Sequence, residues 1–160
     1  MLSIQISDIK DFMSHLLSKD TFDHFYFIEA SIKMGVSYQI QGRINEGFYD
    51  TSVEQTLNRE FCYWKEIRHR IFDIIKGKRL PLSCKIVLGL SKQSISYLIA
   101  HNNSSFREED IEGIYVNILY DPKNLLITTG MSYKNFSLDK SLEYAFDEYL
   151  AKFLKEKAVI

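Results

Sequence analysis

Apolar residues recur along the chain with spacings that alternate between those of a strand and those of a helix. Residues 2–6 (LSIQI) alternate apolar and polar side chains, which predicts a strand. Behind Ser7, a residue type that caps helices, residues 9–17 place apolar side chains three and four positions apart, which predicts a helix. Residues 24–34 and 36–44 are rich in aromatic and β-branched residues and are separated by a glycine, which predicts a hairpin.

The next predicted helix is long. Ser52, with Gln55 three positions later, forms a capping-box pattern, and apolar residues continue at helical spacing as far as Lys76. Such a helix covers about 24 residues, or roughly 36 Å. Gly77 is its expected end. The apolar stripe consists of Leu57, Phe61, Trp64, Ile67, Ile71 and either Ile74 or Ile75.

The second half of the chain repeats the same kinds of element. Residues 82–90 (LSCKIVLGL) predict a strand, and residues 91–102 (SKQSISYLIAHN) predict a short helix. Two further strands are predicted at residues 114–120 and 125–133, joined by a turn that contains a proline. Residues 138–157 form an amphipathic pattern, so the chain is expected to close with a helix.

The predicted order is therefore β-α-β-β-α twice. This order predicts an α+β fold, with an antiparallel or mixed sheet and helices packed on one face. Residues 1–80 and 81–160 are candidate pseudo-repeats, because their openings share a pattern. A ferredoxin-like first half is the alternative, since the first six elements also match that order. No linker-like segment separates the halves, so residues 1–160 are expected to form a single compact domain.

Composition sets limits on the class of protein. The 160 residues are 46% hydrophobic and 14% aromatic, which is enough to bury a substantial core. The formal net charge is −1, so no global field attracts the molecule to nucleic acid or to an anionic membrane. No apolar run reaches the length needed to span a bilayer, and the N-terminal sequence lacks the features of a signal peptide. We expect a cytoplasmic protein with no membrane partner.

Several familiar chemistries lack support in the sequence. Neither the phosphate-loop pattern nor the dinucleotide-binding glycine pattern is present. Cys62 and Cys84 are expected to be reduced, buried thiols. The four histidines form no metal-binding pair, so no metal and no cofactor are predicted. No catalytic residues are assigned, and the sequence gives no positive support for an enzyme.

Positive charge is concentrated in one segment. Residues 61–85 carry seven basic and two acidic side chains. Glu66 is expected to pair with Arg70, and Asp73 with His69 or Lys76. The remaining cations have two interpretations, namely a weak site for nucleic acid or phosphoanions, or the solvated end of a helix. These candidate anion-binding residues are Lys65, Arg68, Lys78, Arg79 and Lys85.

A second candidate site lies in the stretch TTGMSYKNF, which is interpreted as following a strand. Thr128, Thr129, Gly130 and Ser132 gather small hydroxyl side chains around a glycine. One interpretation is a loop that binds a ligand through its backbone amides. Alternatively, the stretch is a bulge or bend before the last helix.

Three segments resemble a known family. They are SDIKDFMSHLL (residues 7–17), IIKGKRLPLSCKIVL (residues 74–88) and TTGMSYKNFSLDKSLEYAFDEYL (residues 128–150). Together they resemble small, single-domain clostridial proteins classed as a domain of unknown function. The resemblance implies a bacterial, stand-alone cytoplasmic protein and no particular activity. None of the segments is a catalytic motif, so no functional residue is carried over.

The sequence leaves three hypotheses for function. The leading one is a non-enzymatic binding or protein-interaction module, because 22 aromatic residues exceed what the core obviously needs. Some of these aromatic residues are expected to form a contact surface for another protein or for a second copy. The alternative is weak binding of nucleic acid or phosphoanions through residues 65–85. The third is an enzyme of unknown class.

Overall fold

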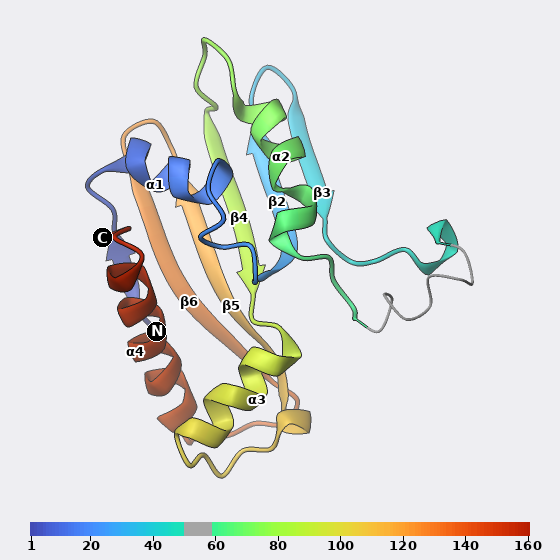
Figure 1. The fold of residues 1–160 in the computed structure, drawn as a ribbon, viewed down its shortest axis with the longest axis vertical. Helices are drawn as coiled ribbons and strands as arrows, with labels where there is room; N and C mark the ends of the chain where they lie inside the picture. The colour runs from blue at the N-terminus through green and yellow to red at the C-terminus, as the bar shows by residue number, and fades with distance from the viewer. Residues whose placement is uncertain (50–58) are drawn as a thin grey trace.

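The computed structural model describes residues 1–49 and 59–160. Its elements follow the predicted order, β-α-β-β-α twice (Figure 1). The first series is β1 (Ser3–Gln5), α1 (Ile9–Leu17), β2 (Tyr26–Lys33), β3 (Ser37–Gln41) and α2 (Trp64–Ile75). The second is β4 (Ser83–Gly89), α3 (Lys92–His101), β5 (Ile111–Tyr120), β6 (Leu125–Tyr133) and α4 (Ser141–Glu156). Single-turn 3-10 helices, η1 (Glu46–Phe48) and η3 (Glu108–Asp110), lie in the connections.

The strands form one six-stranded sheet in the order β1-β6-β5-β4-β2-β3, and all neighbouring strands are antiparallel. The α+β class is thereby confirmed. The pairing does not repeat between the halves, because β4 lies between β5 and β2 whereas β1 pairs only with β6. The alternative of a ferredoxin-like first half is wrong. In that arrangement the first strand lies inside a sheet formed with the other strands of its own half, whereas β1 is an edge strand that pairs with β6.

All four helices pack on one face of the sheet. Along β4, Cys84, Ile86 and Leu88 point into the core, whereas the intervening Lys85 is exposed on the other side. Each helix contributes to the same core cluster, with Phe12 and Leu16 from α1, Trp64 and Ile71 from α2, Ile95 and Leu98 from α3, and Leu142, Phe146, Leu150 and Leu154 from α4. The opposite face, here called the open face, has no helix over it in the part of the chain described (Figure 1).

The helix predicted to begin near Ser52 is shorter than expected. Within the described residues, α2 begins at Trp64 and spans 12 residues, and the Ser52–Gln55 pattern lies outside these residues. Phe61 and Tyr63 are not helical, because they form β-bridges with Arg43 and Tyr26. These long-range bridges use backbone groups that a helix would have needed.

The structure corrects the predicted start of α1 and agrees with the predicted end of α2. The N-cap of α1 is Asp8 rather than Ser7, because the Asp8 carboxylate accepts a hydrogen bond from the amide of Asp11 at 3.0 Å. The predicted end of α2 is confirmed. Its last residue is Ile75, and Gly77 follows with a φ of +146°, a conformation that favours glycine.

Candidate functional site

The five candidate cations do not form one cationic face. Lys65 lies in the first turn of α2, 5.7 Å from the ring centre of Tyr63, whereas Lys78 and Arg79 follow the other end of the helix. A 12-residue helix separates its ends by about 17 Å. Lys85 lies on the open face, with the sheet between it and α2. Of the five, only Lys78 and Arg79 are neighbours on the same exposed loop.

Arg68 was expected to be uncompensated, and that expectation is wrong. Its guanidinium donates two hydrogen bonds to the Asp23 carboxylate, at 2.9 and 3.1 Å, and a third to the Leu17 carbonyl at 3.3 Å. Both partners are largely shielded from solvent. Asp23 is 45 positions away, so helical spacing gave no sign of the pair. Arg68 thus connects α2 to the last residue of α1 and to the segment that follows α1.

Glu66 also has a different partner from the one predicted. Instead of pairing with Arg70, its carboxylate accepts two hydrogen bonds from Arg59, at 2.5 and 2.7 Å. It accepts a further bond from the amide of Tyr63 at 2.6 Å, which caps α2. The bonds from Arg59 are the main reason why the pKa of Glu66 is lowered. The predicted pair of Asp73 with Lys76 is present at 3.0 Å.

The contrast between Arg68 and Lys78 leads to a stability prediction. We expect Arg68→Met to lower the free energy of unfolding by about 1–3 kcal/mol, because it leaves the shielded Asp23 carboxylate without its charged partner. The matched variant Lys78→Met removes a cation that makes no hydrogen bond or ion pair with any described residue, and we expect a change within about 0.5 kcal/mol. Urea unfolding measures both values. Equal effects of the two variants would contradict this assignment of Arg68.

The second candidate site is a regular strand and not a loop. Thr128, Thr129, Gly130 and Ser132 all lie within β6 and pair with β5. Their backbone amides therefore belong to a sheet, which removes the basis for a loop that cradles a ligand. Thr129 faces the helices, where it accepts a hydrogen bond from the Leu2 amide at 2.8 Å and donates one to Asp147 at 2.6 Å.

An apolar groove lies beside the segment that carries Lys78 and Arg79. It has a volume of about 510 Å³ and runs between α1, the C-terminal end of α2 and residues 77–82. Here it is called the α1–α2 groove. Its apolar walls come from Ile9, Met13 and Leu17 of α1, Phe72 and Ile75 of α2, and Leu80, Pro81, Tyr120 and Pro122.

Three of these wall residues are exposed, namely Pro122 and the larger Phe72 and Leu80. Phe72 retains 38% and Leu80 retains 67% of its accessible surface. Pro81 is buried, and the next residue, Leu82, donates its amide to the Lys33 carbonyl at 2.8 Å, so the 77–82 segment is fastened to the end of β2. The backbone that follows Leu80 is therefore anchored to the sheet, while the Leu80 side chain remains exposed to solvent. Isolated exposed apolar residues are ordinary, but exposed residues gathered in a groove indicate a contact surface.

The charge at the α1–α2 groove is positive. Lys10 and Lys76 line it, and no acidic residue does. Lys76 is paired with Asp73, but Lys10, Lys78 and Arg79 have no carboxylate partner among the residues described. Asp121, which adjoins the groove at Pro122, accepts hydrogen bonds from amides within its own turn. Burial raises the pKa of Tyr120 at the groove wall, so this phenol stays neutral.

The structure also bears on the two cysteines, on metal binding and on membrane-spanning helices. Cys62 and Cys84 are both free thiols; Cys84 is buried, which raises its pKa to about 12, whereas Cys62 is only half-buried. Within residues 1–49 and 59–160, no three His, Cys, Asp or Glu side chains converge as metal ligands would. No helix in the same ranges combines the length and apolar character needed to cross a membrane.

The fold and the groove together define an α+β protein that has an antiparallel sheet, helices on one face and an apolar cleft between two of these helices. Residues 15–160 match the Family of unknown function (DUF5721), so the chain belongs to this family, and the expected membership of an uncharacterised family is confirmed. A search of curated proteins found no significant match, and neither did a search of solved structures.

Proposed function

We propose that this protein is a non-enzymatic interaction module whose α1–α2 groove binds an acidic, amphipathic helix of a partner protein. The observation that supports the proposal is the combination of exposed apolar walls with a cationic rim in one groove. Binding of an amphipathic helix in an apolar groove is a recurring mode of protein recognition. The aromatic surplus in the sequence is consistent with it, because Phe72 contributes to the groove wall.

The apolar walls would supply most of the affinity. Phe72 and Leu80 are the large wall side chains that remain exposed and could be buried by a partner. Complete burial of a side chain of this size contributes about 1.5–3 kcal/mol. A partner helix would meet these walls with apolar residues spaced three and four positions apart.

The cations would supply selectivity. Lys10, Lys78 and Arg79 lie at or beside the groove without carboxylate partners in the described chain. Acidic residues at the edges of the partner helix would pair with them, whereas basic residues would be repelled. Exposed pairs of this kind mainly change the association rate and the dependence on salt.

The alternative function, binding of nucleic acid or phosphoanions, has weaker support. Arg68 is already paired with Asp23, and Lys65 and Lys85 lie away from Lys78 and Arg79. Of the five candidates only Lys78 and Arg79 remain together, and even with Lys10 and Lys76 of the adjoining groove these cations are few for a surface that binds nucleic acid. Salt-sensitive binding of an oligonucleotide would nevertheless favour this alternative over the protein partner.

The test uses a designed probe, namely a fluorescent helical peptide of about 18 residues with leucines on one face and glutamates elsewhere. A second peptide has lysine in place of every glutamate. We expect fluorescence anisotropy to detect saturable binding of the acidic peptide and much weaker binding of the basic one. The double variant Phe72→Ala/Leu80→Ala should weaken binding of the acidic peptide by about tenfold or more.

Two further variants complete this experiment. Lys78→Ala/Arg79→Ala should weaken binding at low salt and flatten its salt dependence. Phe136→Ala removes a side chain that is 90% exposed and lies outside the groove, so it is the matched control and should bind like the wild type. Equal binding of both peptides, or binding that survives the loss of Phe72 and Leu80, would refute the proposal. Sedimentation of the protein alone tests whether a second copy occupies the groove.

A further inference from the structure

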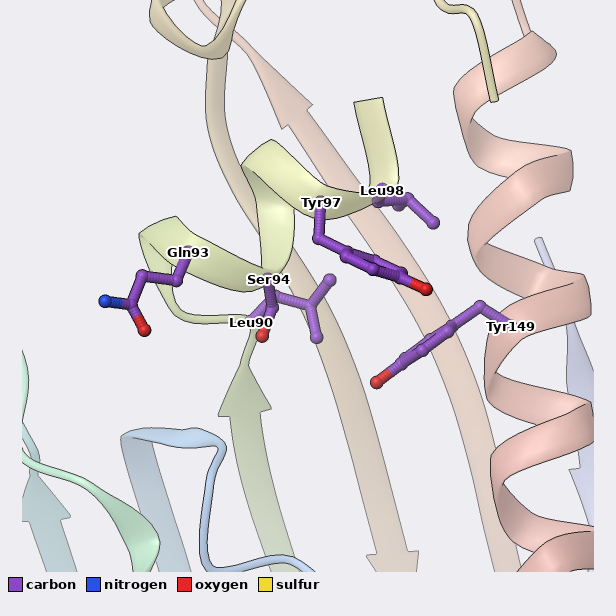
Figure 2. Close-up of a pocket in the computed structure, with 6 residues that line it drawn as sticks. All are labelled: Leu90, Gln93, Ser94, Tyr97, Leu98 and Tyr149. Carbon is purple, nitrogen blue, oxygen red and sulfur yellow. The ribbon is translucent and has the colours of Figure 1, made fainter. Parts of the chain in front are cut away.

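A second cavity lies at the other end of the helical layer, between α3 and α4. It has a volume of about 430 Å³ and shares no lining residue with the α1–α2 groove. Figure 2 shows Tyr97 of α3 and Tyr149 of α4 extending toward one another across it. Here it is called the tyrosine slot. The remaining lining residues are Leu90, Gln93, Ser94 and Leu98.

Both tyrosine rings are held in place by neighbouring aromatic rings. Tyr97 stacks on His101 with ring centres 3.7 Å apart, and the His101 Nδ1 atom lies 3.0 Å from the Tyr97 carbonyl oxygen. Tyr149 makes offset contacts along α4 with Phe146 and Phe153, whose ring centres lie 6.3 and 6.4 Å from its own. A ligand that enters the slot would therefore lose little affinity to the ordering of side chains.

The tyrosine slot is uncharged. Its lining residues carry no acidic or basic side chain. Burial, together with the neighbouring Tyr97 and Glu156, raises the pKa of Tyr149, so this phenol remains a neutral hydrogen-bond donor. Glu156 itself pairs with Lys152 at 3.8 Å. A charged ligand would find no counter-charge among the lining residues, and a neutral ligand would meet no such penalty.

Polar groups in the slot can recognise the edge of a ligand. The Gln93 amide offers both a donor and an acceptor, and its side chain has no hydrogen-bond partner in the described chain. The Ser94 hydroxyl accepts a hydrogen bond from Ser91 at 3.1 Å, which leaves its own proton available for donation. The floor is apolar, because Leu90 and Leu98 are buried.

We propose that the tyrosine slot binds an uncharged, planar heterocycle of nucleobase size. The two phenol rings that line the slot offer aromatic surface to a heterocycle, and stacking of a base on an aromatic ring contributes about 1–3 kcal/mol in proteins that bind single strands. The amide and hydroxyl match the donors and acceptors at a heterocycle edge. The volume falls within the range of about 300–1,000 Å³ that is typical of small-molecule sites.

The proposal is independent of the function proposed for the α1–α2 groove. Adenosine and uridine are suitable neutral probes, and methyl glucoside is a comparator that is also uncharged but has no aromatic face. We expect saturable NMR shifts of the tyrosine ring signals with at least one nucleoside, at a Kd of about 0.1–3 mM.

Variants locate the binding site. Tyr97 is 56% exposed, so Tyr97→Leu should fold normally and should weaken nucleoside binding by about tenfold or more. Gln93→Leu should change the preference between adenosine and uridine. Tyr144→Leu is the matched control, because Tyr144 is an exposed tyrosine of the same helix as Tyr149 but lies outside the slot.

The possible outcomes are decisive. Binding of a nucleoside that is lost in Tyr97→Leu and kept in Tyr144→Leu supports the proposal. Binding of methyl glucoside alone overturns the ligand class. Absence of saturable shifts with both nucleosides up to about 10 mM, or binding that is unchanged in Tyr97→Leu, overturns the site.

Discussion

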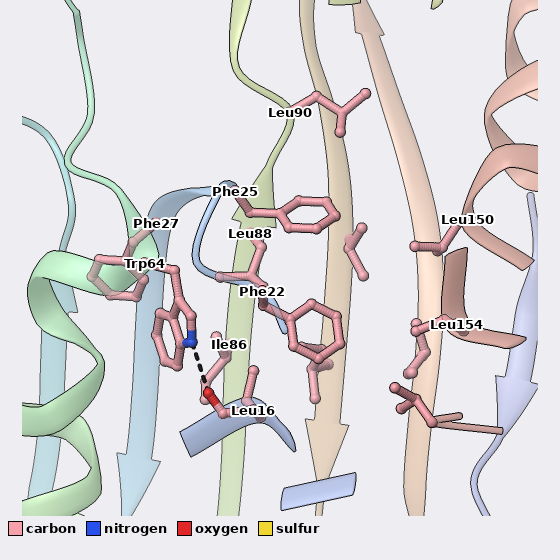
Figure 3. Close-up of a cluster of buried hydrophobic side chains, with 14 of the residues drawn as sticks. Leu16, Phe22, Phe25, Phe27, Trp64, Ile86, Leu88, Leu90, Leu150 and Leu154 are labelled. Carbon is pink, nitrogen blue, oxygen red and sulfur yellow. Dashed lines mark hydrogen bonds between the residues drawn. The ribbon is translucent and has the colours of Figure 1, made fainter. Parts of the chain in front are cut away.

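Replacing Trp64 with alanine is expected to lower the free energy of unfolding by about 3–5 kcal/mol. Trp64 is 0% exposed at the first position of α2, and its ring packs 5.7 Å from that of Phe27. Its indole Nε1 donates a hydrogen bond to the Leu16 carbonyl at 2.8 Å (Figure 3). The substitution therefore creates a large cavity and also leaves a buried carbonyl without its donor.

A second variant separates these two contributions. Trp64→Phe keeps much of the apolar volume but removes the donor, so it should cost about 1–3 kcal/mol. Trp64 is the only tryptophan, so unfolding is best followed by circular dichroism in urea. Phe72→Ala, on the same helix but 38% exposed, should cost clearly less than Trp64→Ala. A Trp64→Ala cost below about 1.5 kcal/mol would contradict the central role of this side chain.

Trp64 also links stability to the proposed site. Its hydrogen bond joins the start of α2 to the end of α1, and these two helices form the walls of the α1–α2 groove. Arg68 reinforces the same connection one turn later through Leu17 and Asp23. These bonds fix the position of α2 relative to the end of α1, beside the groove. Trp64 does not line the groove, so variants at Trp64 should impair peptide binding indirectly, by changing the position of α2 relative to α1.

Much of the fold could be predicted because its elements depend on local pattern. The alternation in β4 and the three- and four-residue spacing in α4 arise from which side chains face the core, and they survive in the sequence. The hairpin of β2 and β3 has a short connection, so it could also be predicted from local sequence. The order of the strands in the sheet is set by contacts between distant segments, and no local pattern records it.

Local pattern failed where distant backbone segments compete for the same residues. Phe61 fits the helical stripe, but its bridge to Arg43 prevents a helix. Glu66 had a plausible neighbour at helical spacing in Arg70, and Arg68 had none, yet Arg59 and Asp23 are their partners. An ion pair between distant residues leaves no periodic signal, so charge spacing alone overestimated the free positive charge.

The candidate site was only partly predictable. The sequence drew attention to residues 61–85 through their charge, and Lys78 and Arg79 from this segment do lie beside the α1–α2 groove. The apolar walls could not be predicted, because Ile9, Phe72 and Leu80 come from three separate segments. In the sequence, Phe72 simply falls off the core stripe. Only the packing of α1 against α2 brings these side chains together.

Replacing Gly42 with alanine is expected to be the second strongly destabilising change. A Cβ atom at Gly42 would lie 1.8 Å from the Phe27 carbonyl oxygen and 2.7 Å from the carbonyl carbon, both backbone atoms that no side-chain rotation can move. The backbone at Gly42 is fixed from both sides. Its amide donates to the Ile28 carbonyl at 2.8 Å, and its carbonyl accepts from the Cys62 amide at 2.9 Å.

We expect Gly42→Ala to lower the free energy of unfolding by about 3 kcal/mol or more, because relief of the overlap must break at least one of these bonds. Gly35→Ala is the matched control, since a Cβ atom there meets nothing within 4 Å. It should leave stability unchanged or raise it by up to about 1 kcal/mol. A Gly42→Ala cost within about 1 kcal/mol of the control would contradict the prediction, because it would show that the backbone around Gly42 accommodates a Cβ atom at little cost. Cys62 directly precedes the cap of α2, so a displaced junction should also shift this helix and weaken peptide binding in the groove.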